Sequence, residues 1–348
     1  MCRKNIFTVL WLTILIGFIK TDPVLAQSGI EPREIVRGGQ SGWQFLKING
    51  DPRQAALGGS FMTTVNPNAN VVFGSPAILT KVEQSSIQFN SVRWIADIQY
   101  YSMVLSHQFR GIGTFAVSLV SLDYGDIPET VHMKLQGGGT APFVTGNTFT
   151  ASDLAFGISY ARTITNQLSL GGTVRYLDEK IASVGMSSCS FDFSTLYYTG
   201  FRSLRLSLAT RNFGPDAHLV GYSEELQAEP VDIRMPLELR AGVAYDILEQ
   251  KNSPHLLTII TEGKVSSDGS EKIHLGAEYV YRDLLALRAG YRFNYDEEGL
   301  TLGAGLNFSM GKCQYSASYA FLDFGALKQV HMFSLGWIIN KNTRMDVK

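Results

Sequence analysis

The chain has 348 residues with a formal net charge of −1, and 45% of its residues are hydrophobic. Nucleic-acid-binding proteins usually carry an excess of basic residues, and this nearly neutral chain has none, so we expect no nucleic-acid partner. The length suffices for one large domain or two ordinary ones.

Residues 1–26 predict a secretory signal peptide. Arg3 and Lys4 precede an apolar run from Ile6 to Ile19, and small residues suit cleavage before Gln27. The alternative is an N-terminal membrane anchor, although the run is short for a spanning helix. Export permits disulfides, but Cys189 and Cys313 fall in distant predicted strands and are expected to be free thiols.

Residues 27–80 predict an N-terminal plug or hatch segment. From 41 to 80 the sequence does not alternate and is rich in Gly, Asn and Pro, the residues of irregular backbone. It also carries Trp43, Phe45 and Phe61, whose apolar side chains favour burial. The strands that follow this segment are predicted to form a barrel, as the next paragraph describes. We expect the segment to enter the lumen of that barrel from the periplasmic side. The alternative is an arm that binds a periplasmic partner.

Residues 81–340 alternate with a period of two, which predicts β-strands. Leu285, Leu287 and Phe293, for example, alternate with residues that include Arg288 and Arg292. Long strands with charge on one face favour a transmembrane β-barrel, whose strands need about 9–11 residues. A soluble β-sandwich is the alternative. The fourteen predicted segments are 86–94, 98–109, 111–124, 150–164, 167–181, 189–199, 203–213, 237–248, 255–267, 271–283, 285–297, 300–311, 312–324 and 330–340.

The predicted fold is therefore an all-β, 14-stranded antiparallel transmembrane barrel with an N-terminal plug and a C-terminal tail at 341–348. Bacterial barrels have even strand numbers, long outer loops and short periplasmic turns. The two longest connections, 125–149 and 214–236, both fall on the outer side by strand parity. They are candidate binding loops, with Phe143, Tyr222, Glu224 and Glu225 as candidate contacts. Alternatively, both loops only cap the mouth.

Polar positions opposite the apolar face are expected to line the lumen. They include Arg175, Arg205, Arg211, Glu238, Arg240, Glu278, Arg288, Arg292 and Asp296. The six histidines are scattered, without metal-ligand spacing, and no Gly-rich loop opens a helix. We therefore expect no enzyme activity, no catalytic residues, no cofactor and no metal.

Several stretches resemble the PorV/PorQ family of outer-membrane proteins. They include "FLKINGDPRQAALGGSF", "SPAIL", "LATRNFGPD" and the closing "VHMFSLGW", and the resemblance covers about 42–339. Ser75, Pro76 and Ala77 stand where the family has an Asn-Pro-Ala motif, and Ser75 departs from it.

The resemblance implies a FadL-like barrel with a hatch, located in the bacterial outer membrane in contact with its lipid. It also implies a role in type IX protein secretion, in which the barrel binds the C-terminal signal domain of cargo proteins and passes them to surface attachment. The translocon and cargo are then its partners. The alternatives are a FadL-like transporter of hydrophobic small molecules and a structural barrel without cargo. The charged lumen positions favour the binding role.

Overall fold

The computed structural model describes residues 41–82, 84–134, 137–182, 184–217, 232–248, 253–311 and 313–339. These residues belong to one compact unit, Arg37–Lys348. The predicted signal peptide and the C-terminal tail lie outside the described residues. Within the described ranges, no helix has the length and apolar character needed to span a membrane.

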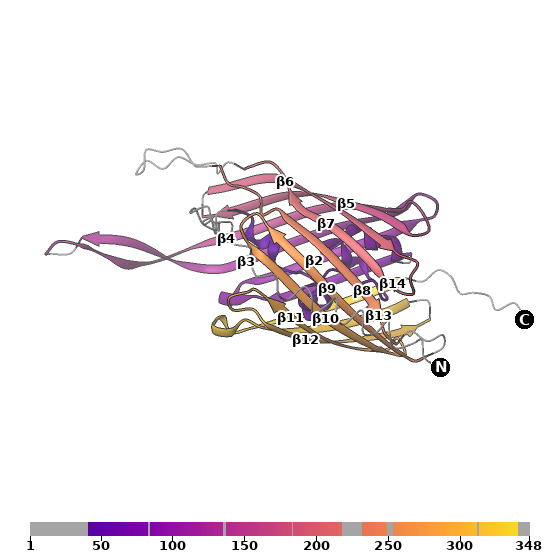
Figure 1. Ribbon diagram of the computed structural model, residues 1–348. Coiled ribbons are helices and arrows are strands. Elements are labelled where there is room, and N and C mark those ends of the chain that lie inside the picture. Colours follow the sequence, from indigo (N-terminus) through magenta and orange to yellow (C-terminus); the bar gives the residue numbers. More distant parts are fainter. Residues whose placement is uncertain are drawn as a thin grey trace, which may run out of the picture. The chain divides into compact units, whose positions relative to one another are not determined.

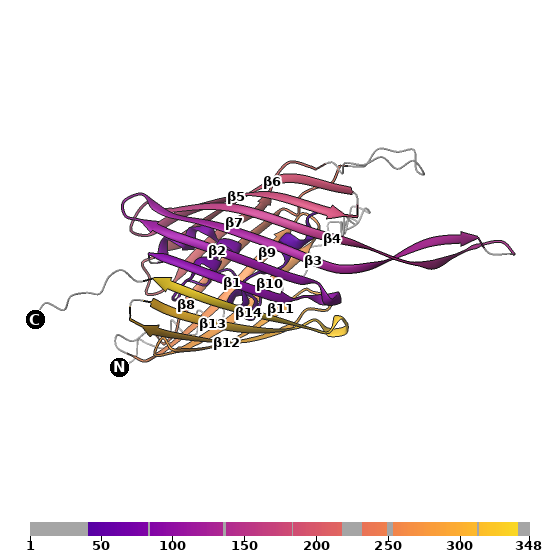
Figure 2. The same ribbon diagram turned by 180° about the vertical axis from the view of Figure 1, so that it is seen from behind.

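The strands of this part of the chain form one closed barrel in which each strand pairs antiparallel with its neighbours in sequence. Figure 1 shows the barrel, and the pairing of β1 with β14, labelled side by side in Figure 2, closes the ring. The predicted fold class, a 14-stranded antiparallel barrel, is confirmed. The strands are β1 Ser85–Arg93, β2 Gln99–Phe109, β3 Gly113–Lys134, β4 Thr140–Thr163, β5 Leu168–Ile181, β6 Val184–Tyr198, β7 Arg205–Phe213, β8 Glu238–Asp246, β9 His255–Ser266, β10 Gly269–Tyr281, β11 Leu285–Phe293, β12 Leu300–Met310, β13 Cys313–Asp323 and β14 Gln329–Ile339.

The strand alternation divides the wall into an apolar outer face and a polar inner face. On β11, the side chain of Leu287 is 49% exposed, whereas its neighbour Arg288 is 7% exposed. Successive residues of a strand point to opposite faces, so the exposed leucines lie on the outside and the arginines in the interior. This is the arrangement that a lipid-facing barrel requires. Cys189 and Cys313 are free.

Residues 125–149 differ from the predicted irregular loop. β3 and β4 continue through this region as a two-stranded ribbon, paired from Asp126 with Thr150 to Lys134 with Thr140. Neither β2 nor β5 follows them there, and the ribbon projects beyond the barrel (Figures 1 and 2). The strand register shifts twice along the ribbon, between Asp123 and Asp126 and between Pro128 and Thr130.

The ribbon carries paired apolar side chains along one face. Ile127 pairs with Phe149, and Val131 pairs with Phe143. The other face carries Thr130 and His132, together with the exposed Val144.

Residues 41–82 fold into short helical elements inside the ring of strands (Figures 1 and 2). They are η1 Gln44–Lys47, α2 Pro52–Ala56, η2 Ala69–Phe73 and η3 Pro76–Lys81; η4 Ile95–Asp97 and η5 Gly325–Leu327 lie in strand connections. α2 packs against β11 to β14, and η3 packs against β3 to β6. The wall makes room with glycine: a Cβ on Gly290 would lie 2.1 Å from the backbone nitrogen of Gly58.

The segment reaches the end of the barrel that carries the ribbon. We call this the outer end, because the longest connections of outer-membrane barrels are extracellular. Ser41 forms a parallel bridge with Arg234, in the connection between β7 and β8 at this end. β1 begins at the opposite, inner end. The chain therefore runs from the outer mouth through the interior before the first strand starts.

Candidate binding cavity at the outer mouth

In the inner half of the barrel, buried arginines lie against carboxylates. Glu278 accepts hydrogen bonds from Arg53 of α2 at 2.6 Å and from Arg288 of β11 at 2.7 Å. Arg205 and Asp246 form a two-pronged pair at 2.6 and 2.7 Å. Removing one partner of such a pair leaves an uncompensated buried charge, so these contacts fix one arrangement of segment and wall.

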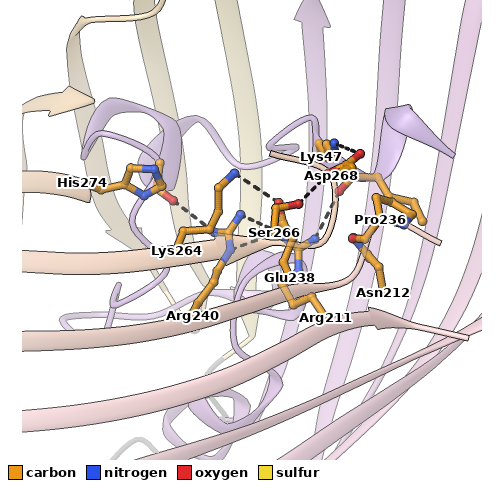
Figure 3. Close-up of polar contacts among 12 residues, drawn as sticks. Lys47, Arg211, Asn212, Pro236, Glu238, Arg240, Lys264, Ser266, Asp268 and His274 are labelled. Atoms are coloured by element: carbon orange, nitrogen blue, oxygen red, sulfur yellow. Dashed lines mark hydrogen bonds and ion pairs between the residues drawn. The ribbon is translucent and has the colours of Figure 1, made fainter. Parts of the chain in front are cut away.

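Towards the outer end, a larger cluster surrounds Glu238, whose side chain is fully buried (Figure 3). Its carboxylate accepts from Arg240 at 2.9 Å, Lys264 at 3.1 Å and Arg211 at 3.4 Å. Glu262 lies 3.4 Å from Arg240 and also accepts the backbone N–H of Phe61 at 2.9 Å. The cluster thus joins β7, β8 and β9 to the N-terminal segment.

Asp268, in the turn between β9 and β10, fastens the outer end of the segment (Figure 3). It accepts hydrogen bonds from Ser41, Gln44, Lys47 and Ser266. Burial alone would raise the pKa of this carboxyl, but the bonds from Lys47 and Ser41 outweigh burial and lower it below its ordinary value. Asp268 therefore stays ionised at neutral pH.

Between this fastening and the ribbon lies a cavity of about 420 Å³. Ligand sites of small molecules occupy about 300–1,000 Å³. The walls of the cavity differ in character. One side is apolar and comes from η1, β3, β13, β14 and the β1–β2 connection, with Phe45, Ile48, Trp94, Leu122, Leu322 and Met332. The other side is polar and comes mainly from β8 to β11 and the turns that follow β9 and β11, with Arg240, Lys264, Asp268, Lys272, His274, Arg292, Tyr295 and Glu298.

Tyr295 organises the polar wall. Its hydroxyl lies 2.9 Å from Nε2 of His274, and the ammonium of Lys272 stands 3.7 Å from its ring centroid. A cation over an aromatic face is attracted by the electron density of the ring. Arg292 and Lys264 lie farther from the same ring, at 5.9 and 5.7 Å.

The predicted lumen residues divide into two groups. Side chains that lie buried toward the interior are Arg175, Arg205, Arg211, Glu238, Arg240, Glu278, Arg288 and Arg292. Asp296 does not line the lumen; it is exposed in the β11–β12 connection. The strand ends at Phe293, and Asn294 has a left-handed φ of 63°, which breaks the alternation. The same break turns Tyr295 inward instead of toward lipid.

The residues of the expected plug motif are buried at the start of η3. Ala77 donates its backbone N–H to the hydroxyl of Ser194 at 2.8 Å, and the hydroxyl of Ser75 lies 3.4 Å from that of Ser207. A Cβ on Gly171 of β5 would lie 2.4 Å from the nitrogen of Ala77. Pro76 and its neighbours therefore anchor η3 to the wall.

Of the predicted contact residues of the outer connections, only Phe143 lies among the residues that the structure describes. Phe143 lies on the apolar face of the ribbon and is 54% exposed. Tyr222, Glu224 and Glu225 lie outside the described residues. Sequence reasoning missed the cavity residues Lys264, Lys272 and Asp268. The alternation in "TEGKVS" places Glu262 and Lys264 on the same face of a strand. This pattern could have predicted Lys264 as a lumen residue.

No family model matches the sequence, and no curated protein matches it. Solved structures do resemble the fold. The toluene transporter TbuX of Ralstonia pickettii superposes with a TM-score of 0.52 at 12% identity, covering 83% of this chain and 97% of that one. The P. putida toluene transporter TodX gives 0.53 at 12% identity, over 84% and 99%. A Pseudomonas aeruginosa FadL homologue gives 0.52 at 12% identity, over 84% and 98%.

These likenesses show that the chain has the FadL-type barrel fold, which is the coarser part of the predicted resemblance. They include transporters and no enzyme, and they contain nothing specific to the PorV/PorQ family. Within the described residues, no group of three or more His, Cys, Asp or Glu side chains is placed to hold a metal ion.

Proposed function

We propose that the protein resides in the outer membrane and binds small hydrophobic molecules at its outer mouth for uptake. The observation that carries this proposal is the cavity with one apolar wall, placed at the entrance of a FadL-type barrel. The transport activities named for TbuX and TodX support the same class of function. The transporter alternative is thus favoured over the secretion role that the sequence suggested first.

Passage beyond the cavity requires movement of the N-terminal segment. α2 and η3 fill the interior below it, held by the Arg53–Glu278 pair and by the bond from Ala77 to Ser194. Hydrophobic molecules do not cross a dense array of buried ion pairs readily. Binding at the mouth and release of the segment are therefore separate steps in the proposed uptake.

The binding step is tested with N-phenyl-1-naphthylamine, an uncharged hydrophobic dye, on the full protein in lipid nanodiscs. We expect saturable fluorescence enhancement above empty nanodiscs. Leu322→Trp should abolish it, because the larger side chain fills the cavity from β13. Leu302→Trp, on the exposed outer face of the neighbouring strand β12, is the matched control. Equal binding by both variants, or no saturable binding by the wild type, contradicts the proposal.

A second candidate function is the binding of cargo in type IX secretion, as the PorV/PorQ resemblance implies. The observation that favours it is the projecting ribbon with its apolar face, since exposed apolar patches often mark protein contacts. Replacing 125–149 by a two-residue turn removes this face and leaves the paired barrel strands. Loss of cargo attachment at normal barrel levels supports this function, and unchanged attachment in the native bacterium contradicts it.

A further inference from the structure

We propose that the inner end of the barrel is a docking surface for the head groups of anionic phospholipids. The charge that recognises them comes from four exposed arginines, which we call the inner ring: Arg110, Arg162, Arg202 and Arg282. This surface lies at the end opposite the ribbon (Figure 2), so the proposal does not depend on the cavity at the outer mouth.

The connections at the inner end carry basic side chains with little acid to neutralise them. Arg110 lies in the β2–β3 turn, Arg202 in the β6–β7 turn and Arg282 in the β10–β11 turn, and Arg162 lies at the inner end of β4. Among the described residues of these connections, the one acid is Asp283, which accepts a hydrogen bond from the N-terminal segment at 3.0 Å. An anion that approaches this end therefore meets an excess of positive charge.

The outer connections do not share this excess. Asp296 and Glu297 follow β11, and Asp323 and Lys328 lie on either side of η5, all with exposed side chains. The chain as a whole has a formal net charge of −1. The inner ring is therefore a feature of one end of the barrel and not a consequence of overall composition.

Three of the four arginines lie on the lipid side of the wall. Arg162 follows a fully buried alanine on β4 and therefore points outward. Nη1 of Arg202 donates to the hydroxyl of Tyr245 at 3.2 Å, and the guanidinium of Arg282 lies 5.3 Å from the ring centroid of Tyr281. Both tyrosines alternate with buried residues of their strands, so they face outward and hold the arginines there.

Each arginine of the inner ring also has a large exposed apolar side chain within two residues. These side chains are exposed by 48% to 62% and belong to Ile112, Ile164, Phe201 and Leu284. The boundary of a bilayer accommodates both halves of such a pair, the apolar side chain among the acyl chains and the charge among the head groups. An acidic soluble protein would match only the charges, so the repeated pairing favours a lipid surface.

Two members of the inner ring line the same hollow at the rim. Arg110 and Arg162 border a space of about 370 Å³ between the β2–β3 turn and the end of β4. The hydroxyl of Tyr160 donates to the backbone oxygen of Ile112 at 2.7 Å, which ties this turn to β4. A lipid phosphate in the hollow would thus lie near two guanidinium groups, which suit oxyanions because their N–H groups form a fork.

The test is the lipid selectivity of the full protein in phosphatidylcholine vesicles, measured by electron paramagnetic resonance of spin-labelled lipids. We expect the wild type to associate with phosphatidylglycerol more strongly than with phosphatidylcholine. Replacing the whole inner ring by glutamine should bring this ratio close to unity, because each base near the surface attracts an anionic lipid by roughly fivefold. Replacement by lysine should retain the ratio. Phosphatidylethanolamine, which has a phosphate but no net charge, should show little preference.

The matched control replaces four exposed bases of the outer end by glutamine, which removes the same charge: Lys134, Lys180, Arg234 and Lys328. Heat modifiability on detergent gels confirms that each variant is folded. An equal fall of the ratio in both glutamine variants, or none in the inner variant, overturns the proposal. A wild type without preference for phosphatidylglycerol also overturns it and would assign the inner ring to an acidic periplasmic protein.

Salt dependence tests the electrostatic origin of the selectivity. At about 1 M salt the Debye length falls to about 3 Å, so the wild-type preference for phosphatidylglycerol should largely disappear. A preference that persists at this salt concentration would show that the arginines do not read the charge of the lipid, which contradicts the proposal.

Discussion

In the inner half of the barrel, Arg205 and Arg288 each lie against a buried carboxylate, whereas Lys272 at the outer mouth lies against an aromatic ring. Both regions are built from the same inward positions of neighbouring strands. These inner pairs join neighbouring strands of the wall, and Glu278 also holds the N-terminal segment through Arg53. The outer cation forms no ion pair with a described residue, although Glu298 lines the same cavity. Inward-facing charges of this barrel are therefore held in two ways, by a buried carboxylate or by an aromatic ring.

The inner region gives the largest expected effect. Glu278→Gln should lower the free energy of unfolding by about 3–5 kcal/mol, because Arg53 and Arg288 both lose a buried carboxylate. Equilibrium denaturation in lipid vesicles measures this change. Glu271→Gln, at an exposed position of the same strand, is the control and should have little effect. Similar losses in both variants would show that the buried ion pairs of Glu278 do not stabilise the inner half of the barrel more than an exposed carboxylate does.

The outer face of the same wall gives the next effect. Leu287 is adjacent to Arg288 but points to lipid, and an arginine in the lipid-facing band costs roughly 2–4 kcal/mol. Leu287→Arg should therefore reduce the amount of heat-modifiable barrel on detergent gels. Thr130→Arg, on the ribbon beyond the barrel, should leave it unchanged. Equal yields would mean that the assignment of the two faces is wrong.

Asp268 sharpens the comparison at the mouth. Asp268→Asn should cost about 1–2 kcal/mol at neutral pH, because the bonds from Lys47 and Ser41 lose their charge assistance. Because folding lowers its pKa, the carboxylate stabilises the fold above the ordinary value of about 3.9, and this contribution is lost as pH falls through the folded pKa.

The difference in unfolding free energy between wild type and Asp268→Asn should thus shrink below about pH 4. Asp126→Asn, at an exposed position of the ribbon, should show no such pH dependence. A constant difference between wild type and Asp268→Asn down to pH 2 would show that Asp268 does not fasten the segment through its charge.

The smallest effect is expected at Lys272. Lys272→Met should change the unfolding free energy by less than about 0.5 kcal/mol, because no ion pair is broken. The same denaturation experiment measures it beside Glu278→Gln. A loss as large as that of Glu278→Gln would show that Lys272 has a structural partner, and the two regions would no longer differ in kind.

Local pattern was enough to predict the wall of the barrel. The opposite facing of Leu287 and Arg288 follows from period two alone, because strand geometry fixes it without reference to distant residues. The same reasoning failed where the backbone left that geometry. Asn294 adopts a left-handed conformation, so Tyr295 turns into the cavity and Asp296 lies exposed in the β11–β12 connection, whereas alternation predicted the opposite facing for Tyr295 and a lumen position for Asp296.

The cavity and its ion pairs could not be predicted from local sequence pattern. Arg53 and Glu278 are 225 positions apart, and nothing in either neighbourhood indicates the other. The cavity combines η1, β3 and the last two strands with β8 to β11, so its volume depends on how the segment packs within the closed ring. The ribbon at 125–149 was predictable in principle, since Ile127 and Val131 continue an alternation, but its glycines favoured a loop.

The path of the N-terminal segment has a consequence for assembly. Ser41 lies at the outer mouth, while β1 starts at the inner end and must meet β14 to complete the ring. If the ring closed first, a chain bearing Lys47 and Arg53 would have to be threaded through a finished tube. Folding is simpler when the segment first packs on β3 to β6 and on β11 to β13 and the β1–β14 seam closes around it last. From the order of the chain we therefore expect the interior to be occupied before the wall is sealed.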